Sequence, residues 1–166
     1  MFSSALQTGT SGVEILSPAG TGKDQRHAAF TGAVSRSYER DLKGYCYDLS
    51  KSGPSTAITC PASGRDSLGV IQPLLVLQIH CPAAPAAGPA GEKVSIEITV
   101  MSAAGQRLRL HFSSSFRAME CNGLHAQVPW AWVGVPPGRW TEAVLDLPYT
   151  TARCFQGAQF ASIHSV

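Results

Sequence analysis

The sequence predicts an all-β fold in which two sheets pack as a jelly-roll-like sandwich. Its 16 glycines and 11 prolines recur between short apolar segments, a pattern typical of strands joined by turns. No stretch of a dozen residues keeps the 3.6-residue apolar period of an amphipathic helix. Apolar and polar side chains alternate instead, most clearly over Lys93–Met101. We therefore expect a single β-sandwich domain over residues 1–166.

A β-hairpin is predicted where two alternating segments, Lys93–Met101 and Arg107–Phe112, flank a short connection that contains Gly105. The apolar residues fix which side of each strand faces the core, because a slip of one residue would put all of them in water. In the register that we favour, Val100 faces Leu108. Glu97 then lies opposite His111 and diagonal to Arg109.

The run Leu74–His80 is apolar on both faces over its first half, which predicts a central strand covered by a second layer. One short helical turn is expected near residues 149–156, with Tyr149 and Phe155 packing inward. Further strands are predicted at Val13–Leu16, Leu42–Leu49, Ala57–Cys60, Leu124–Val128, Trp140–Leu147 and Gln159–Val166.

Two segments bear on the limits of the domain. Residues 82–91 consist entirely of alanine, proline and glycine, which predicts a flexible loop inserted in the domain. The last residues, with Phe160, Ile163 and Val166, resemble a strand that stops without a polar tail. We therefore expect the chain to be the N-terminal part of a longer protein.

The bulk composition argues against several classes of partner. Charged residues make up 14% of the chain and the net charge is +2, so no broad field favours nucleic acid or a membrane surface. The N-terminus lacks the features of a signal peptide, and no apolar run approaches eighteen residues. Five widely spaced cysteines without a CxxC pair fit buried thiols in a reducing compartment, so we expect an intracellular, cytoplasmic protein.

No assembled catalytic or metal-binding motif is found. The residue types of zinc sites are present, but their spacing matches no zinc element, and the adjacent His80 and Cys81 would point to opposite faces of a strand. A cysteine or zinc hydrolase would rest on residue types alone. We expect no catalytic residue, no metal and no cofactor, and the protein is predicted not to be an enzyme.

Two groups of side chains are candidates for binding a partner. Arg107, Arg109 and His111, with Arg117 as a further member, form a basic stripe on the predicted solvent face, which would suit an acidic partner surface such as that of tubulin. The alternative is an ordinary solvated face. Trp130 and Trp132 could form a stacking platform for sugar rings or partner side chains, as in a carbohydrate-binding module. Alternatively, these two tryptophans close the end of the sandwich while Trp140 lies in the core.

One sequence motif is best explained by a structural role rather than a functional one. It is Ile58-Thr59-Cys60-Pro61, followed by Leu68-Gly69-Val70. We expect Cys60 to be a buried small hydrophobic residue at a strand end, Pro61 to end the strand ladder and Gly69 to permit a turn.

These spellings resemble the cilia- and flagella-associated protein 20 family from end to end, in family order. Within the family, the chain is most similar to longer members that carry this domain at their N-terminus. The matching segments are Met1-Phe2, Gln7-x-Gly9, Val13-Glu14-Ile15, Ile58-Thr59-Cys60-Pro61, Leu68-Gly69-Val70-Ile71-Gln72, Leu75-Val76-Leu77-Gln78-Ile79, Leu124-His125-Ala126, Trp140, Leu145-Asp146-Leu147 and Phe155-Gln156-Gly157-Ala158, which leads to Phe160 and Ser162.

The resemblance implies a β-sandwich like that of a carbohydrate-binding module, no catalysis, and residence in the axoneme of cilia or flagella. It further implies tubulin or the microtubule lattice and other axonemal proteins as partners, as at the inner junction of doublet microtubules. The expected function is that of a structural, microtubule-associated protein without nucleic-acid, membrane or small-molecule ligands. A carbohydrate-binding module that uses the tryptophan platform is the alternative.

Overall fold

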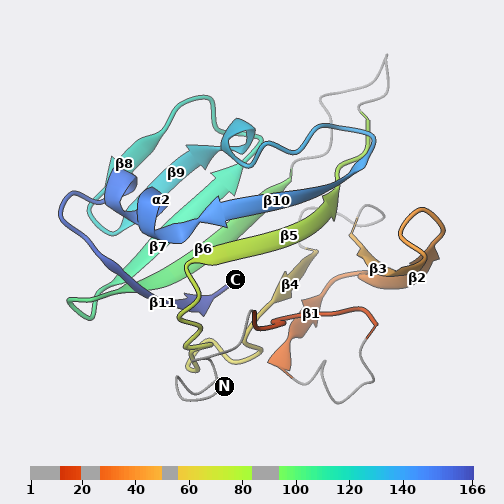
Figure 1. Ribbon diagram of the computed structural model, residues 1–166, viewed down its shortest axis with the longest axis horizontal. Helices are drawn as coiled ribbons and strands as arrows, with labels where there is room; N and C mark the ends of the chain where they lie inside the picture. Colours follow the sequence, from red (N-terminus) through yellow and green to blue (C-terminus); the bar gives the residue numbers. More distant parts are fainter. Residues whose placement is uncertain (1–11, 20–26, 50–55, 84–93) are drawn as a thin grey trace.

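The computed structural model describes residues 12–19, 27–49, 56–83 and 94–166, and these residues form an all-β sandwich (Figure 1). The predicted fold class is thereby confirmed. The elements in chain order are β1 (Ala29–Thr31), β2 (Ser35–Glu39), β3 (Gly44–Asp48), β4 (Ala57–Thr59), β5 (Leu74–His80), β6 (Ser95–Ser102), β7 (Arg107–Ser113), β8 (Glu120–Asn122), β9 (His125–Pro129), the 3-10 helix η2 (Trp130–Trp132), β10 (Trp140–Asp146), α2 (Leu147–Cys154) and β11 (Phe160–Ser165).

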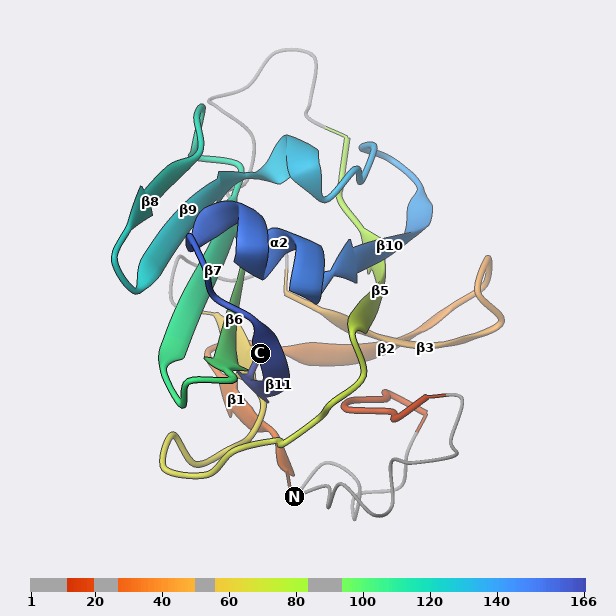
Figure 2. The ribbon, with the colours of Figure 1, turned by 60° about the vertical axis from the view of Figure 1, so that its left-hand side comes forward.

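The two main layers are a five-stranded sheet, in the order β11-β6-β7-β9-β8, and the antiparallel pair β10-β5. Figures 1 and 2 show the β5–β10 pair lying across the larger sheet, and the shorter pairs β1–β4 and β2–β3 lying to one side. No helix among the described residues is long and apolar enough to cross a membrane.

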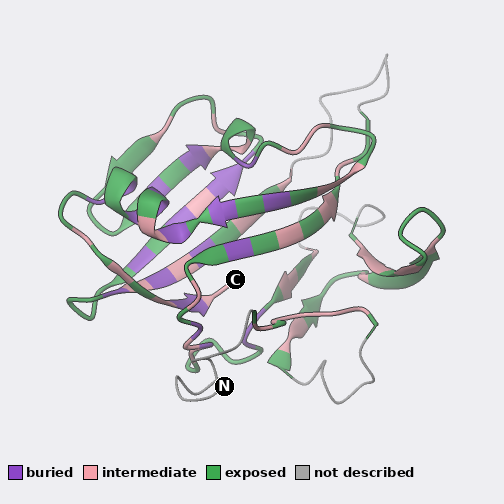
Figure 3. Ribbon diagram, viewed as in Figure 1, coloured by how far each residue is buried: buried purple, intermediate pink, exposed green. Residues whose placement is uncertain are grey.

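The core lies between the two layers and is centred on β6, β7 and β9 (Figure 3). Ile98, Leu110 and Val128 have no exposed surface, and Phe112 is the largest fully buried side chain. From the opposite layer, Leu75 and two residues of β10, Ala143 and Leu145, join the same cluster. Because burial of apolar surface is the dominant favourable term in folding, this cluster holds the layers together.

The predicted β6–β7 hairpin is confirmed with its register. Val100 pairs with Leu108, and Glu97 pairs with His111. The turn is closed by the Gly105 backbone N–H, which donates to the carbonyl of Ser102 at 2.9 Å. Gly105 has a φ of 77°, in the left-handed region that glycine adopts at little cost.

The segment from Cys60 to Val70 closes the edge of the larger sheet. It runs beside β11, which leaves this side of the edge strand with few unpaired backbone groups. Cys60, Leu68 and Val70 are buried in the core, and Gly69 between them has a φ of 64°. The backbone hydrogen bonds are Cys60 N to Val166 O (2.7 Å), Val166 N to Cys60 O (2.8 Å), Leu68 N to His164 O (2.9 Å) and Ile163 N to Val70 O (2.7 Å).

The roles predicted for this segment are therefore confirmed. Cys60 is buried, β4 ends at Thr59, two residues before Pro61, and Gly69 has a φ in the left-handed region that glycine adopts easily. The structure adds the partner of the segment, which is β11 at the other end of the chain.

The prediction that Leu74–His80 is a central strand covered on both faces was wrong. Its bounds are those of β5, but Leu74 and Val76 are 52% and 54% exposed while Leu75 is buried. These exposed side chains, together with Val144 of β10, show that the outward face of the β5–β10 pair is open to solvent. An apolar run in the sequence predicts a strand with apolar side chains, but it does not show whether other elements pack against both faces of that strand.

One other predicted strand is wrong, three strands were missed and one predicted loop is not tested. Residues 13–16 form no strand, although Val13, Ile15 and Leu16 pack partly buried against the core. The strands β1, β2 and β8 were not predicted. The predicted loop lies, from residue 84 to residue 91, outside the described residues.

The helical turn expected near residues 149–156 is the two-turn helix α2. Asp146 caps it, because its carboxylate accepts a hydrogen bond from the Tyr149 backbone N–H at 2.8 Å. Phe155 is buried as predicted, but Tyr149 is 61% exposed, and the inward face is formed by Leu147, Thr150, Thr151 and Cys154.

Candidate functional site

The outward face of the five-stranded sheet carries the basic stripe predicted on β7. Arg107 and Arg109 are exposed and His111 is half-buried, while the intervening leucines point into the core. The parallel neighbour β9 places His125 beside Arg109 and Gln127 beside His111. We call these five residues, Arg107, Arg109, His111, His125 and Gln127, the β7–β9 face.

Arg109 forms an ion pair with Glu97 of the neighbouring strand β6. Its Nε lies 3.2 Å from Oε1 of Glu97, and the two side chains are 48% and 46% exposed. This pair joins the diagonal positions that the register predicted. Because such an exposed ion pair contributes only about 0.2–1 kcal/mol, it does not immobilise either group strongly.

His111 is covered on one side by the loop that follows β7. Its ring makes an edge-to-face contact with Phe116, with 5.0 Å between ring centroids. The imidazole is therefore less available to a partner than the two arginines.

Arg107 also affects the pKa of a buried histidine, His164. His164 on β11 is buried, and its Nδ1 has no hydrogen-bond partner among the described residues. Burial, together with the positive charge of Arg107, lowers the pKa of His164 below its ordinary value of 6.5. His164 is accordingly neutral in the folded protein at physiological pH.

We expect the stability of the fold to decrease in mild acid because of His164. The unfolded chain binds a proton near pH 6.5 that the folded chain binds only at lower pH, so the stabilisation is complete above that value and is lost as the pH falls through the folded pKa. Urea unfolding between pH 7.5 and 4.5 would measure the effect. His164→Gln should reduce the pH dependence, whereas the exposed-site control His125→Gln should retain it. Equal pH dependence in both variants would contradict this assignment.

The remaining predicted binding residues lie at the other end of β7. Ser113 pairs with Pro129, the residue that precedes η2, so Trp130 and Trp132 lie roughly 20 Å along the strand from Arg107. Trp130 packs partly buried against the core, and Trp132 is 45% exposed. Arg117 is exposed in the loop between β7 and β8. The structure thus separates these residues from Arg107 and does not present both indole rings equally to solvent.

Trp140 is half-buried at the start of β10. Its ring lies 5.5 Å from that of His80, centroid to centroid, at the position where the two residues pair across β10 and β5. A depression of about 280 Å³ adjoins them, and its lining includes Glu39, Asp41 and Arg139. The sequence could not reveal this group, because β2 and β10 meet only through the fold.

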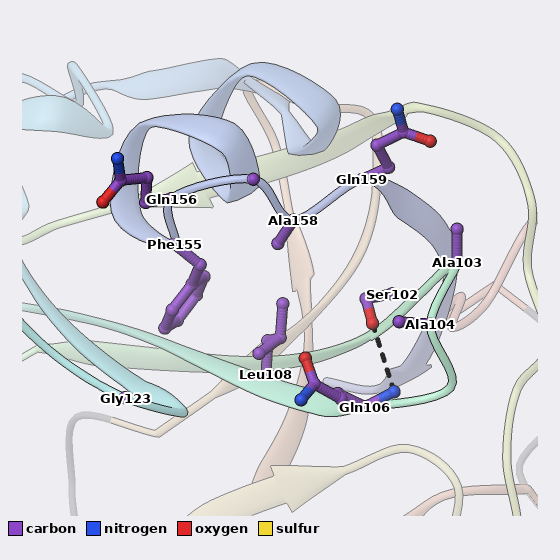
Figure 4. Close-up of a pocket in the computed structure, with 11 residues that line it drawn as sticks. Ser102, Ala103, Ala104, Gln106, Leu108, Gly123, Phe155, Gln156, Ala158 and Gln159 are labelled. Atoms are coloured by element: carbon purple, nitrogen blue, oxygen red, sulfur yellow. Dashed lines mark hydrogen bonds between the residues drawn. The ribbon is translucent and has the colours of Figure 1, made fainter.

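A second depression, of about 320 Å³, lies between the β6–β7 turn and the segment after α2 (Figure 4). Leu108, Phe155 and Ala158 point toward one another, while the side-chain amides of Gln156 and Gln159 point away. None of the residues that line it has a titratable side chain. General acid–base catalysis requires such a group, so this hollow has no apparatus for it.

The cysteines and histidines do not form a metal site. Across the described ranges, no three His, Cys, Asp or Glu side chains are placed to hold a metal ion. All five cysteines are free thiols, and burial raises the pKa of Cys60 and of Cys81. Buried thiols with raised pKa values are poor nucleophiles.

A family model supports the end-to-end resemblance noted in the sequence. The model described as the CFA20 domain matches residues 1–166, which is the whole chain. The matched residues include the segment Cys60–Val70, which closes the sheet edge along β11, and the residues that line the depression after α2.

Proposed function

The chain belongs to the CFA20 domain family, a cilia- and flagella-associated family, and from this membership we propose that it is a non-enzymatic structural protein of the axoneme. In this proposal it binds microtubules or microtubule-associated proteins through the β7–β9 face. The single observation that carries the proposal is the family match over the whole chain.

The lack of assembled chemistry supports a structural role. The larger depression is lined without a titratable group, and the described residues include no metal-ligand cluster. A binding protein needs neither, because its affinity comes from shape and polar contacts spread over an interface of about 800 Å² per partner.

The shape and charge of the β7–β9 face suit a partner with an acidic surface. The face belongs to a broad sheet, and no described element covers Arg107, Arg109 or His125. Glu97 offsets part of the charge of Arg109. The resulting positive charge is modest, which favours electrostatic attraction that is sensitive to salt.

Cosedimentation with stabilised microtubules tests the proposal. We expect the wild-type chain to pellet with microtubules and the double variant Arg107→Glu/Arg109→Glu to bind at least about tenfold more weakly, a loss of roughly 1.4 kcal/mol or more. Raising the ionic strength should weaken the wild-type binding in the same direction. The fold should survive the change, since both side chains are exposed.

A matched control reverses two arginines elsewhere on the surface. Arg139→Glu/Arg153→Glu changes the net charge by the same amount, at exposed positions before β10 and in the last turn of α2. We expect this variant to pellet like the wild type. Equal losses in the two variants would indicate a nonspecific charge effect, and failure of the wild type to bind microtubules or isolated axonemes would refute the proposal.

A further inference from the structure

Two of the five cysteines meet where α2 ends against the edge strand β8. Cys154 is the last residue of α2 and is buried, with 6% of its surface exposed. Cys121 is the middle residue of β8 and is exposed. The C-terminal end of the helix lies over the β8–β9 end of the larger sheet (Figures 1 and 2).

The strand register directs Cys121 toward the helix. Cys121 pairs with Ala126 of β9, and directly opposite residues of two strands place their side chains on the same side of the sheet. Ala126 is 1% exposed and belongs to the core, so this is the inner side, which α2 covers. The edge position of β8 leaves the Cys121 thiol open to solvent while it faces the buried Cys154.

The pKa of Cys154 is consistent with this placement of the two thiols. The pKa of Cys154 is raised to about 12, chiefly by burial and further by the neighbouring Cys121 side chain, against a smaller opposite effect of Arg153. This agrees with the strand register, which directs Cys121 to the inner side of the sheet that α2 covers. Cys154 stays protonated, so it is not the thiol that reacts first with a solvent oxidant.

We propose that Cys121 and Cys154 form an oxidant-sensitive pair, in which a hydroperoxide converts the free thiols to a disulfide that ties the end of α2 to β8. Each thiol has a different task. Cys121 meets the oxidant, and Cys154 resolves the product.

The chemistry balances in two steps. The thiolate of Cys121 attacks a peroxide oxygen, so that an S–O bond forms, the O–O bond breaks and water or an alcohol leaves. The sulfur of Cys154 then attacks the resulting sulfenic acid; the S–S bond forms, the S–O bond breaks, and the departing hydroxide takes the Cys154 proton as water.

Peptide mapping of the whole chain tests this proposal, because trypsin separates all five cysteines. Cleavage after lysine and arginine leaves Cys121 in residues 118–139 and Cys154 at the start of the peptide that follows Arg153. After brief treatment with hydrogen peroxide and blocking of the remaining thiols, we expect these two peptides to be joined in the non-reduced digest. Dithiothreitol should separate them.

Two variants assign the roles. In Cys154→Ser the sulfenic acid of Cys121 should persist and react with dimedone, whereas Cys121→Ser should give no joined peptide at equal peroxide. Cys46→Ser is the matched control, since Cys46 lies on β3 in contact with Ser37, and it should form the pair as the wild type does. The oxidised wild type should also melt several degrees higher, because the bond constrains the unfolded chain.

The wild-type digest decides the outcome even if a variant fails to fold. Oxidation of Cys121 to sulfinic acid with Cys154 still a free thiol would overturn the proposal. A mixture in which Cys121 joins Cys46, Cys60 or Cys81 as often as Cys154 would overturn it too, because it would show pairing through unfolded molecules.

Discussion

Replacing Phe112 by alanine is expected to destabilise the fold by about 3–5 kcal/mol, a large share of the roughly 5–15 kcal/mol that holds a domain of this kind together. Phe112 is 1% exposed and is the largest fully buried side chain of the described residues. It stands in the middle of the larger sheet, where β7 pairs with Ile96 on one side and Val128 on the other. Truncation leaves a cavity that strands paired on both sides cannot close by moving inward.

Chemical denaturation would measure this loss as a shift in midpoint with an unchanged slope. Phe116→Ala is the matched control: the ring is half-buried in the loop after β7, where it contacts His111, and its loss should cost less than about 1.5 kcal/mol. Similar losses for the two variants would mean that the core is not centred on β7.

The β6–β7 hairpin could be predicted in detail because its two strands each have one apolar face. Ile98 and Leu110 must both be inside, so the register follows from the parity and the length of the turn. The same parity put Arg107 and Arg109 on the solvent face. The parity of the apolar residues could not identify the other neighbour of β7. The parallel pairing of β7 with β9, which brings His125 beside Arg109, depends on a crossover that no local pattern encodes.

The segments that were missed have weak or ambiguous patterns. β8 is the tripeptide Glu-Cys-Asn, whose three residues are all exposed and show no apolar alternation, so the placement of Cys121 toward α2 could not be foreseen. The sequence of residues 13–16 is typical of a strand, but this segment packs against the core without pairing with another strand. The segment Cys60–Val70 was identified by its spelling, whereas its partner β11 lies about a hundred residues away and only the folded chain brings them together.

The second large expected effect is a difference in the loss of stability between two neighbouring residues of β5, one buried and one exposed. Leu75→Ala should cost about 2–4 kcal/mol, because Leu75 is 7% exposed and packs in the core between the layers. Val76→Ala should cost no more than about 0.5 kcal/mol, because its side chain is 54% exposed and faces Val144, which is 55% exposed, on the outward surface. Urea denaturation of the two variants beside the wild type would measure both values.

This contrast decides between the two interpretations of the apolar run. If β5 were covered on both faces, as its sequence suggested, Val76→Ala would remove buried methyl groups and cost about 1–2 kcal/mol. Val144→Ala is the cross-strand control, since Val144 pairs with Val76 and shares its exposure. Small losses for both valines beside a large loss for Leu75 would establish one buried and one open face. Large losses for the valines would mean that further protein covers this surface, and that the apolar run was a correct signal of a second layer.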